Sequence, residues 1–184
     1  EVFFNDKKDL IPKIEETEAK IDQLHKAVKA YAEDIMQAGI SDDAARVLTL
    51  YVASSGNIER IGDYGKKLPE YYAYRQNRPK DFSQQAMTEL SGMYAEAHHA
   101  IVTALDGFIN DDPDKAREVA PIAGKLRGLE VDRHIQRLDK QECDSETGLV
   151  YVDILGIIEH IGYHSNNVAK ATISSCTAEH KAKV

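Results

Sequence analysis

The chain has 184 residues, with 31 Asp and Glu against 23 Lys and Arg, and it contains no Trp. This length suits a single domain with a sizeable core. A net charge of −8 argues against a nucleic-acid partner, because affinity for phosphate backbones comes from clustered Lys and Arg. We find neither a signal peptide nor an apolar run long enough to cross a bilayer. Cys143 and Cys176 show no zinc-binding spacing, which predicts unpaired thiols in a reducing compartment.

The first two predicted helices follow from apolar residues that alternate spacings of four and three, as in the seam of a packed helix. The first seam contains Leu10, Ile14, Thr17, Ile21, Leu24, Val28, Tyr31 and Ile35. Gly39 ends this helix, and Ser41 predicts the N-cap of the next. We expect Pro69 to kink or interrupt the second helix and the polar residues 75–79 to end it.

Three further helices are expected in the rest of the chain. Ser83 predicts the cap of a third helix that runs to about Asn110. Asp112-Pro113 predicts the start of a fourth, which Pro121 is expected to bend, and a fifth runs from about Glu146 to about Ser175. Strand alternation appears nowhere in the sequence. The prediction is an all-α fold of five long antiparallel helices.

A helical phrase occurs twice in the chain, as Ile58-Glu-Arg-Ile-Gly-Asp63 and as Ile158-Glu-His-Ile-Gly-Tyr163. The repeat extends further, because residues 3–9 match residues 108–114 at an offset of 105, and Lys20 and Leu24 match Lys125 and Leu129 in the same frame. In the second copy, a complete helix precedes the matched segment, and the first copy lacks this helix.

We therefore interpret residues 1–184 as one domain of two tandem three-helix-bundle repeats, 1–78 and 79–184. The first repeat lacks its first helix. Because the sequence begins at Glu1 rather than Met and the first repeat lacks a helix, we interpret the chain as a piece of a longer protein.

Two pairs of carboxylates stand out in the first repeat. Glu18 and Asp22 are four residues apart, as are Glu59 and Asp63, so each pair shares one helix face. Like charges there repel, and two such pairs on antiparallel neighbouring helices could surround a hard divalent ion or ferric iron. Two other interpretations stay open: the acids are solvated surface residues, or Arg60 forms a structural ion pair with an acid of a neighbouring helix.

The second repeat differs at the corresponding positions. Glu159 is retained, but Tyr163 replaces the second acid, and the positions matching the first pair hold Ala123 and Arg127. His160 and His164 are four residues apart and could hold a transition metal with Glu159, although such pairs are more often structural. A phosphate-binding Gly-rich loop, a nucleophile elbow and an HExxH motif are all absent, so we predict that the chain is not an enzyme.

These motifs resemble the PhoU family. The phrase at 58–63 with Glu18-xxx-Asp22 on the preceding helix is similar to that family, whose members are two three-helix repeats that bind metal clusters through paired E/DxxxD motifs and act in phosphate regulation. The second half is similar to the PhoU-like C-terminal domain of bacterial Na/phosphate cotransporters. That likeness is carried by Arg133-His-Ile-Gln-Arg137, Cys143, Gly148-Leu-Val-Tyr-Val-Asp-Ile-Leu155 and the second helical phrase.

The resemblance implies a metal site of Glu18, Asp22, Glu59 and Asp63, and a cytoplasmic regulatory domain at the bacterial inner membrane. Its partner would be the membrane-spanning part of the same polypeptide. The alternative is a free-standing regulator that docks on a phosphate transporter or sensor kinase, and a homodimer is compatible with either.

Overall fold

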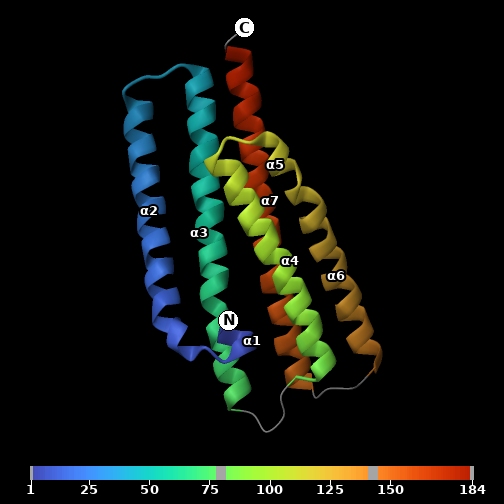
Figure 1. Cartoon of the computed structure of the whole chain (residues 1–184). Coiled ribbons are helices and arrows are strands. Elements are labelled where there is room, and N and C mark those ends of the chain that lie inside the picture. Colours follow the sequence, from blue (N-terminus) through green and yellow to red (C-terminus); the bar gives the residue numbers. More distant parts are fainter. Residues whose placement is uncertain (1, 78–81, 141–144, 183–184) are drawn as a thin grey trace.

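The structure is a computed structural model that describes residues 2–77, 82–140 and 145–182, with side chains described for 2–77, 82–129 and 147–177. Five long helices run alternately up and down (Figure 1): α2 (Ile11–Gln37), α3 (Asp42–Gln76), α4 (Gln84–Ile109), α6 (Val119–Lys140) and α7 (Ser145–Ala182). Three short elements complete the order: α1 (Val2–Asn5), the 3-10 helix η1 (Lys8–Leu10) and α5 (Pro113–Arg117). The described part of the chain contains no strand, which confirms the all-α prediction. The count of five helices is not confirmed, since it omitted the short ones.

The predicted helix ends are present. The hydroxyl oxygens of Ser41 and Ser83 accept hydrogen bonds from the backbone N–H groups three residues later, at 3.3 and 3.2 Å. The Asp112 carboxylate accepts from two backbone N–H groups of α5, both at 3.0 Å. Gly39 follows α2 with φ of 81°, the left-handed conformation that ends many helices. Each cap satisfies backbone groups that have no partner within the helix.

The two prolines inside the predicted helices have different effects. We expected Pro69 to kink or interrupt the second helix; α3 continues through Pro69 to Gln76, so it is not interrupted. Packing of α3 against α7 and α1 keeps this helix continuous despite the missing N–H. The predicted fourth helix is instead divided, because α5 ends at Arg117 and α6 begins at Val119. The ring of Pro121 conflicts with the carbonyl four residues earlier, that of Arg117, which explains the break at this point.

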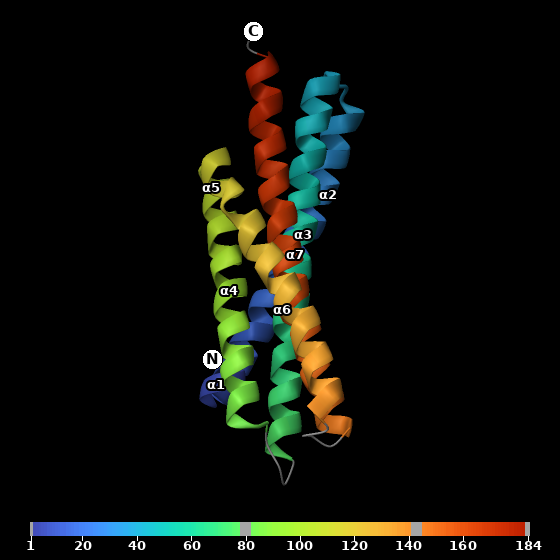
Figure 2. The same cartoon turned by 90° about the vertical axis from the view of Figure 1, so that its right-hand side faces the viewer.

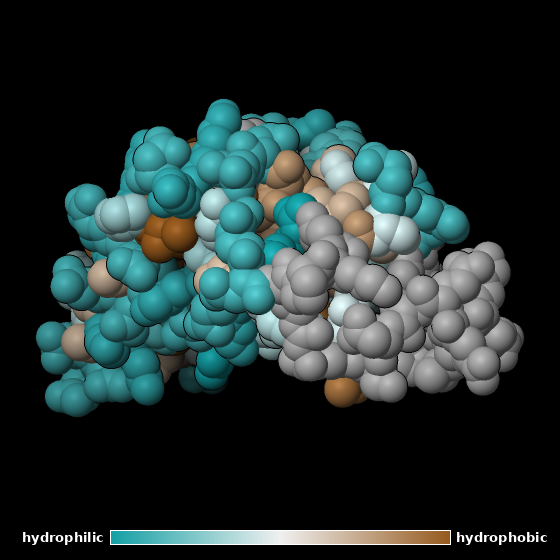
Figure 3. Space-filling view, turned by 90° about the horizontal axis from the view of Figure 1, so that it is seen from below, coloured by the Kyte–Doolittle hydropathy of each residue, from teal (hydrophilic) through white to brown (hydrophobic). Residues whose placement is uncertain are grey.

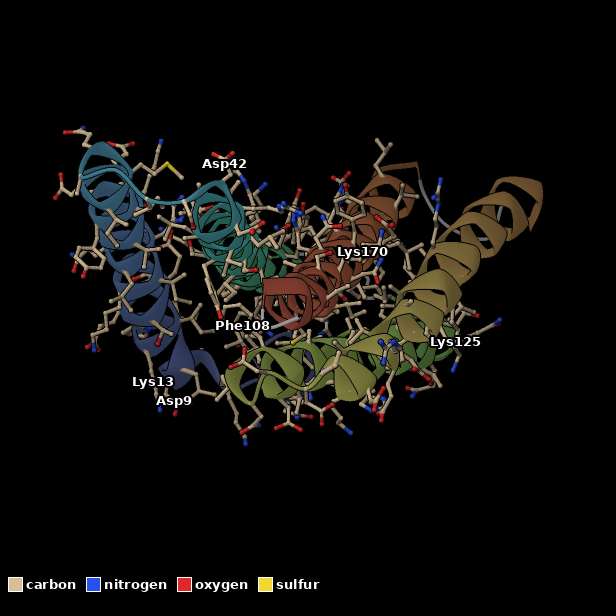
Figure 4. The ribbon with its side chains drawn as sticks, turned by 90° about the horizontal axis from the view of Figure 1, so that it is seen from above. Asp9, Lys13, Asp42, Phe108, Lys125 and Lys170 are labelled. Atoms are coloured by element: carbon tan, nitrogen blue, oxygen red, sulfur yellow. The ribbon has the colours of Figure 1, made fainter. Side chains whose placement is uncertain are left out.

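The core lies where α7 is surrounded by α3, α4 and α6, as Figures 1 and 2 show. Its largest fully buried side chains include Leu90, Met93, Leu126, Tyr151, Ile154 and Ile158. Helix α2 stands at the edge of the bundle and packs mainly on α3 (Figure 4). Its predicted packed seam is therefore wrong in its second half, where Leu24 is 65% exposed and Tyr31 is 68% exposed. In the view from below, the coloured part of the surface is mostly hydrophilic, with a few hydrophobic patches (Figure 3).

Two pairs of features recur at the repeat offsets. Asp6 and Asp111, 105 residues apart, both have positive φ, at 60° and 49°. Gly62 faces Ile21 of α2, and Gly162 faces the matching Leu126 of α6. These pairs support the two-repeat interpretation. The match of Ile21 with Leu126 indicates that the offset of 105 still holds within α6.

Candidate functional site at the α2–α3 interface

The four carboxylates of the first repeat lie along the interface of α2 and α3. Glu18 and Asp22 come from α2, and Glu59 and Asp63 come from α3. Their side chains are partly buried, with exposures of 15% for Glu18, 20% for Glu59, 33% for Asp63 and 36% for Asp22. Partial burial strengthens electrostatic interactions relative to bulk water. The interpretation of fully solvated acids therefore does not fit these positions.

Gly62 faces α2 at this site. A Cβ atom at this position would lie 3.4 Å from Ile21 Cδ1 and 4.0 Å from Glu18 Cγ. Such contact leaves little room for a larger side chain. Gly65, which we also expected to permit close approach, faces open space, with no atom within 4 Å of an added Cβ. Gly62 therefore lies at the contact between α2 and α3, where an alanine would also fit, and neither glycine is required for the approach of the two helices.

Each of the four acids lies near a basic side chain. Lys66 Nζ of α3 donates to Glu18 Oε2 across the interface at 2.8 Å, and Lys26 Nζ donates to Asp22 Oδ2 at 2.7 Å. Arg60 Nη1 donates to Asp63 Oδ2 at 3.2 Å, and Arg60 Nε lies 3.7 Å from Glu59 Oε2. The arrangement is an ion-pair network that joins the two helices.

The pKa values of the lysines report the negative field of these acids. The pKa of Lys66 is raised, first by its hydrogen bond to Glu18 and further by the charges of nearby acids including Asp63. The pKa of Lys26 is raised, first by the hydrogen bond to Asp22, with Glu59 and Glu18 adding to the effect. The acids of both helices therefore act on the same cations, which makes this interface a favourable place for positive charge.

The donor set suits a hard cation, but its present geometry does not form a chelate. Carboxylate oxygens are the ligands that hard divalent ions and ferric iron prefer. Among the residues with described side chains, no three His, Cys, Asp or Glu groups gather closely enough to hold one ion. Binding of a metal at these four acids would require Lys66 and Arg60 to move away. The ligand set stays a prediction.

A polar hollow of about 240 Å³ opens beside the network. Its lining is of mixed charge and consists of Glu18, Arg60, Asp63, Tyr64, Lys66, Lys67 and Glu70. Lys67 Nζ lies 5.3 Å from the centre of the Tyr64 ring, within the range of a cation–π contact. Solvent therefore reaches the ion pairs from this side.

The second-repeat residues occupy the interface of α3 and α7. Tyr64 stacks on His160, with ring centres 5.1 Å apart, and lies 5.8 Å from the ring of His164. His164 Nδ1 hydrogen-bonds Asn57 Oδ1 at 2.9 Å, and Glu159 Oε2 lies 3.4 Å from His160 Nδ1. Burial lowers the pKa of His164, and the nearby charges of His160 and Arg60 lower it further. The two His side chains are thus separately engaged with α3 and do not converge with Glu159 on one point among the described groups.

Sequence reasoning missed several residues of this region. Lys26 follows Asp22 by four residues, so the ordinary spacing of helical ion pairs could have found it. Lys66 pairs with an acid 48 positions away, and no local signal marks it. Asn57 accepts hydrogen bonds from His164 and, at 3.2 Å, from Asn167 Nδ2, and only the packing of α3 on α7 shows this. Of the two cysteines, Cys143 lies outside the described residues, and Cys176 Sγ donates to the Asp111 carbonyl oxygen at 3.4 Å.

Comparisons with known proteins agree with this architecture. A solved structure of PhoU from Pseudomonas aeruginosa superimposes with a TM-score of 0.82 at 18% identity, covering 95% of this chain and 84% of that one. A curated relative from Thermotoga maritima, named phosphate-specific transport system accessory protein PhoU homolog 1, is 24% identical over 169 residues, which is 89% of this chain and 72% of the relative. The PhoU domain family model matches residues 1–71 and 90–172. The chain therefore belongs to the PhoU family.

Proposed function

We propose that this chain is a non-enzymatic regulator of phosphate transport that acts by docking its helical faces on a component of the transport system. The observation that carries this proposal is family membership over most of the chain, together with a relative whose name assigns it to a phosphate-specific transport system. The all-helical surface of the described residues suits a docking role.

The sequence leaves two arrangements of this regulator open. The first is a cytoplasmic domain joined to a Na/phosphate cotransporter at the inner membrane, and the second is a separate regulator of a transporter or sensor kinase. The relatives that match carry PhoU names, and this favours the separate regulator. Among the described helices, none is long and apolar enough to cross a membrane. In either arrangement, we propose that the chain acts at the cytoplasmic face of the inner membrane.

The function is tested by deleting the coding segment in the source organism and measuring uptake of radiolabelled phosphate after growth at low and at high phosphate. A regulator predicts that uptake no longer follows the phosphate supply. Expression of residues 1–184 as a separate polypeptide should restore the response if the separate regulator is correct. Restoration only by a fusion to the transporter would favour the cotransporter arrangement, and an unchanged response in the deletion strain would overturn the proposal.

As a second part of the proposal, Glu18, Asp22, Glu59 and Asp63 bind a hard divalent ion or iron after Lys66 and Arg60 turn outward. The raised pKa values of Lys26 and Lys66 support it, because they show that these acids stabilise positive charge at the interface. The test is metal content by mass spectrometry after purification without chelators or metal columns, followed by titration with manganese, iron and zinc.

The proposal predicts stoichiometric metal in the wild type and its loss in the Glu59→Ala/Asp63→Ala double variant. Glu159→Ala is the matched control, because it changes the corresponding acid of the second repeat and should leave the metal content unaltered. Absence of metal from the wild type after titration would show that the acids serve only the ion pairs.

A further inference from the structure

His25 of α2 lies at the interface with α3, next to the acids of the candidate site. Its side chain is partly buried, and its ring lies against Gly56, where an added Cβ atom would be 3.4 Å from His25 Cε1 and 4.0 Å from His25 Nε2. His25 Nδ1 forms a hydrogen bond with Ser55 Oγ of α3 at 2.9 Å. The ring is therefore held on α3 by one of its two nitrogens.

The same contact shows which ring nitrogen carries the hydrogen. The hydroxyl of Ser55 donates its only hydrogen to the carbonyl oxygen of Val52, at 2.8 Å. Ser55 Oγ therefore accepts the bond with His25, and His25 Nδ1 donates it. In a neutral imidazole the other nitrogen, Nε2, then keeps its lone pair. Metal-binding histidines have this arrangement, in which one nitrogen donates to a protein group and the other binds the metal.

The register of the two helices brings His25 close to two of the acids. Three contacts fix this register: His25 with Ser55, Ile21 with Gly62, and Glu18 with Lys66. Because α2 and α3 run in opposite directions (Figure 1), Asp22 lies at the level of Glu59. His25 follows Asp22 by three residues on α2, and its partner Ser55 precedes Glu59 by four residues on α3. Each of these two pairs shares a helix face, so His25, Asp22 and Glu59 border one part of the interface.

A positive charge already lies at this part of the interface. Lys26 Nζ donates to Asp22 Oδ2 at 2.7 Å, and the pKa of Lys26 is raised first by this hydrogen bond and further by the charges of Asp22, Glu59 and Glu18. Acids of both helices therefore stabilise one cation. The side chain of Lys26 is 72% exposed, and exposed ion pairs contribute little to stability, so this lysine can turn into solvent and leave its place to a metal ion.

The types of donor indicate which metals suit this position. A carboxylate three residues before a His is the spacing with which helical bundles hold di-metal centres, and Asp22-x-x-His25 has this spacing. Carboxylates and water suit Mg²⁺, Ca²⁺ and Mn²⁺, whereas an imidazole nitrogen suits zinc and iron. A site that includes His25 should therefore favour Fe²⁺ or Zn²⁺ over Mg²⁺ or Ca²⁺.

We propose that His25 Nε2 is a ligand of the metal site in the first repeat, together with the carboxylates of Asp22 and Glu59, and that it directs this site toward Fe²⁺ or Zn²⁺. Among the described side chains these three groups do not yet converge on one point, so binding requires Lys26 to leave and both carboxylates to turn toward Nε2. The inference rests on the metal site of the proposed function. It adds to that site a nitrogen ligand outside the two carboxylate pairs.

The first test compares the affinities for Zn²⁺ and Mn²⁺ by isothermal titration calorimetry of the whole chain. We expect His25→Gln to weaken Zn²⁺ binding about tenfold or more and Mn²⁺ binding by a clearly smaller factor, because only zinc prefers the imidazole. His99→Gln is the matched control, since His99 is exposed on α4 and should leave both affinities unaltered. Circular dichroism of each variant verifies that it is folded.

The second test separates coordination by His25 from a purely structural role. Histidine is labelled with a heavy nitrogen isotope, and pulsed electron paramagnetic resonance detects its coupling to one equivalent of bound Mn²⁺. We expect a nitrogen coupling in the wild type that His25→Gln removes and His99→Gln keeps. Ser55→Ala removes only the group that orients the ring, so it should keep the coupling and weaken Zn²⁺ binding less than His25→Gln does.

Two results would overturn this inference and leave the four-acid site standing. One is an unchanged preference for Zn²⁺ in His25→Gln while Glu59→Ala/Asp63→Ala abolishes metal binding. The other is a nitrogen coupling that persists in His25→Gln. Absence of metal from the wild type after titration would overturn the inference and the four-acid site together.

The regulatory role is separable from both, because it is tested by phosphate uptake. A Zn²⁺ site that depends on His25, in a chain whose deletion leaves the phosphate response unchanged, would support the inference and reject the function. Loss of the phosphate response in the deletion strain, with no effect of His25→Gln on Zn²⁺ binding, would reject the inference and keep the function.

Discussion

The Gly162→Ala variant tests how closely the helices of the second repeat pack. A Cβ atom at Gly162 would lie 2.5 Å from Leu126 Cδ1, a distance that real Cβ contacts essentially never show. Leu126 is completely buried, so its side chain cannot move aside without displacing other core atoms. The corresponding Gly62 has a wider separation, 3.4 Å to Ile21 Cδ1, and Ile21 is only partly buried. The same substitution should therefore have opposite effects in the two repeats.

The magnitude follows from two opposing contributions. Replacing Gly by Ala within a helix stabilises it by about 0.5–1 kcal/mol. Overpacking a well-filled core costs about 1–3 kcal/mol. We expect Gly162→Ala to lower the free energy of unfolding by about 1 kcal/mol net, and Gly62→Ala to raise it by about 0.5 kcal/mol. For a chain of this size the two melting temperatures should differ by about 3–6 °C.

The assay is chemical denaturation monitored by circular dichroism. Gly162→Ala is measured both in the wild-type chain and in a chain that also carries Leu126→Ala. Leu126→Ala alone should cost about 2–5 kcal/mol because it leaves a cavity. It also removes the atom that the new Cβ would meet, so in this background Gly162→Ala should become neutral or stabilising. An equal cost of Gly162→Ala in both backgrounds would refute the clash, and equal effects at Gly62 and Gly162 would refute the difference in packing between the repeats.

Two further predictions concern contacts between distant segments. The lowered pKa of His164 favours its neutral form in the folded state, so the unfolded chain binds more protons as pH falls through the ordinary value of 6.5. The stability that neutral His164 contributes should be fully present above that pH and should decline as pH falls toward and through the folded pKa. His164→Gln can still hydrogen-bond Asn57, and it should flatten this part of a plot of unfolding free energy against pH. An unchanged plot would contradict the assignment to His164. Phe3→Ala should cost about 3 kcal/mol or more in denaturation experiments, because the ring is 3% exposed and lies 5.0 Å from Arg75 Cζ. Phe108→Ala, at the matching position of the second repeat, should cost less because that ring is only partly buried, and the reverse order would contradict this difference in burial.

The sequence predicted those parts of the fold that depend on local chemistry. The spacing of apolar residues located the five long helices. Side-chain caps at Ser41 and Ser83 located the starts of α3 and α4, and the cap at Asp112 located the start of the short helix α5. The break before Pro121 was foreseen only as a bend, because local rules do not say whether packing will hold a helix together. At Pro69 the packing of α3 on its neighbours does so.

The candidate site was predictable only in part. The spacing of Glu18, Asp22, Glu59 and Asp63 showed that two acids share each helix face, and the structure adds that both faces meet. The spacing could not show that Lys66 and Arg60 form ion pairs with these acids, because the pair of Lys66 with Glu18 joins residues far apart in sequence. Ion pairs across helices depend on register and rotamers, which local patterns do not fix.

The two repeats differ in the carboxylates at the interface of their last two long helices. In the second repeat, the positions that correspond to Glu18 and Asp22 hold Ala123 and Arg127. The first repeat keeps its acids partly buried, and Glu18 lines both a polar hollow and an apolar hollow on the same pair of helices. Because the side chain of Glu18 is only 15% exposed, its carboxylate depends on the charge of Lys66, and a metal ion at this position would have to replace that charge.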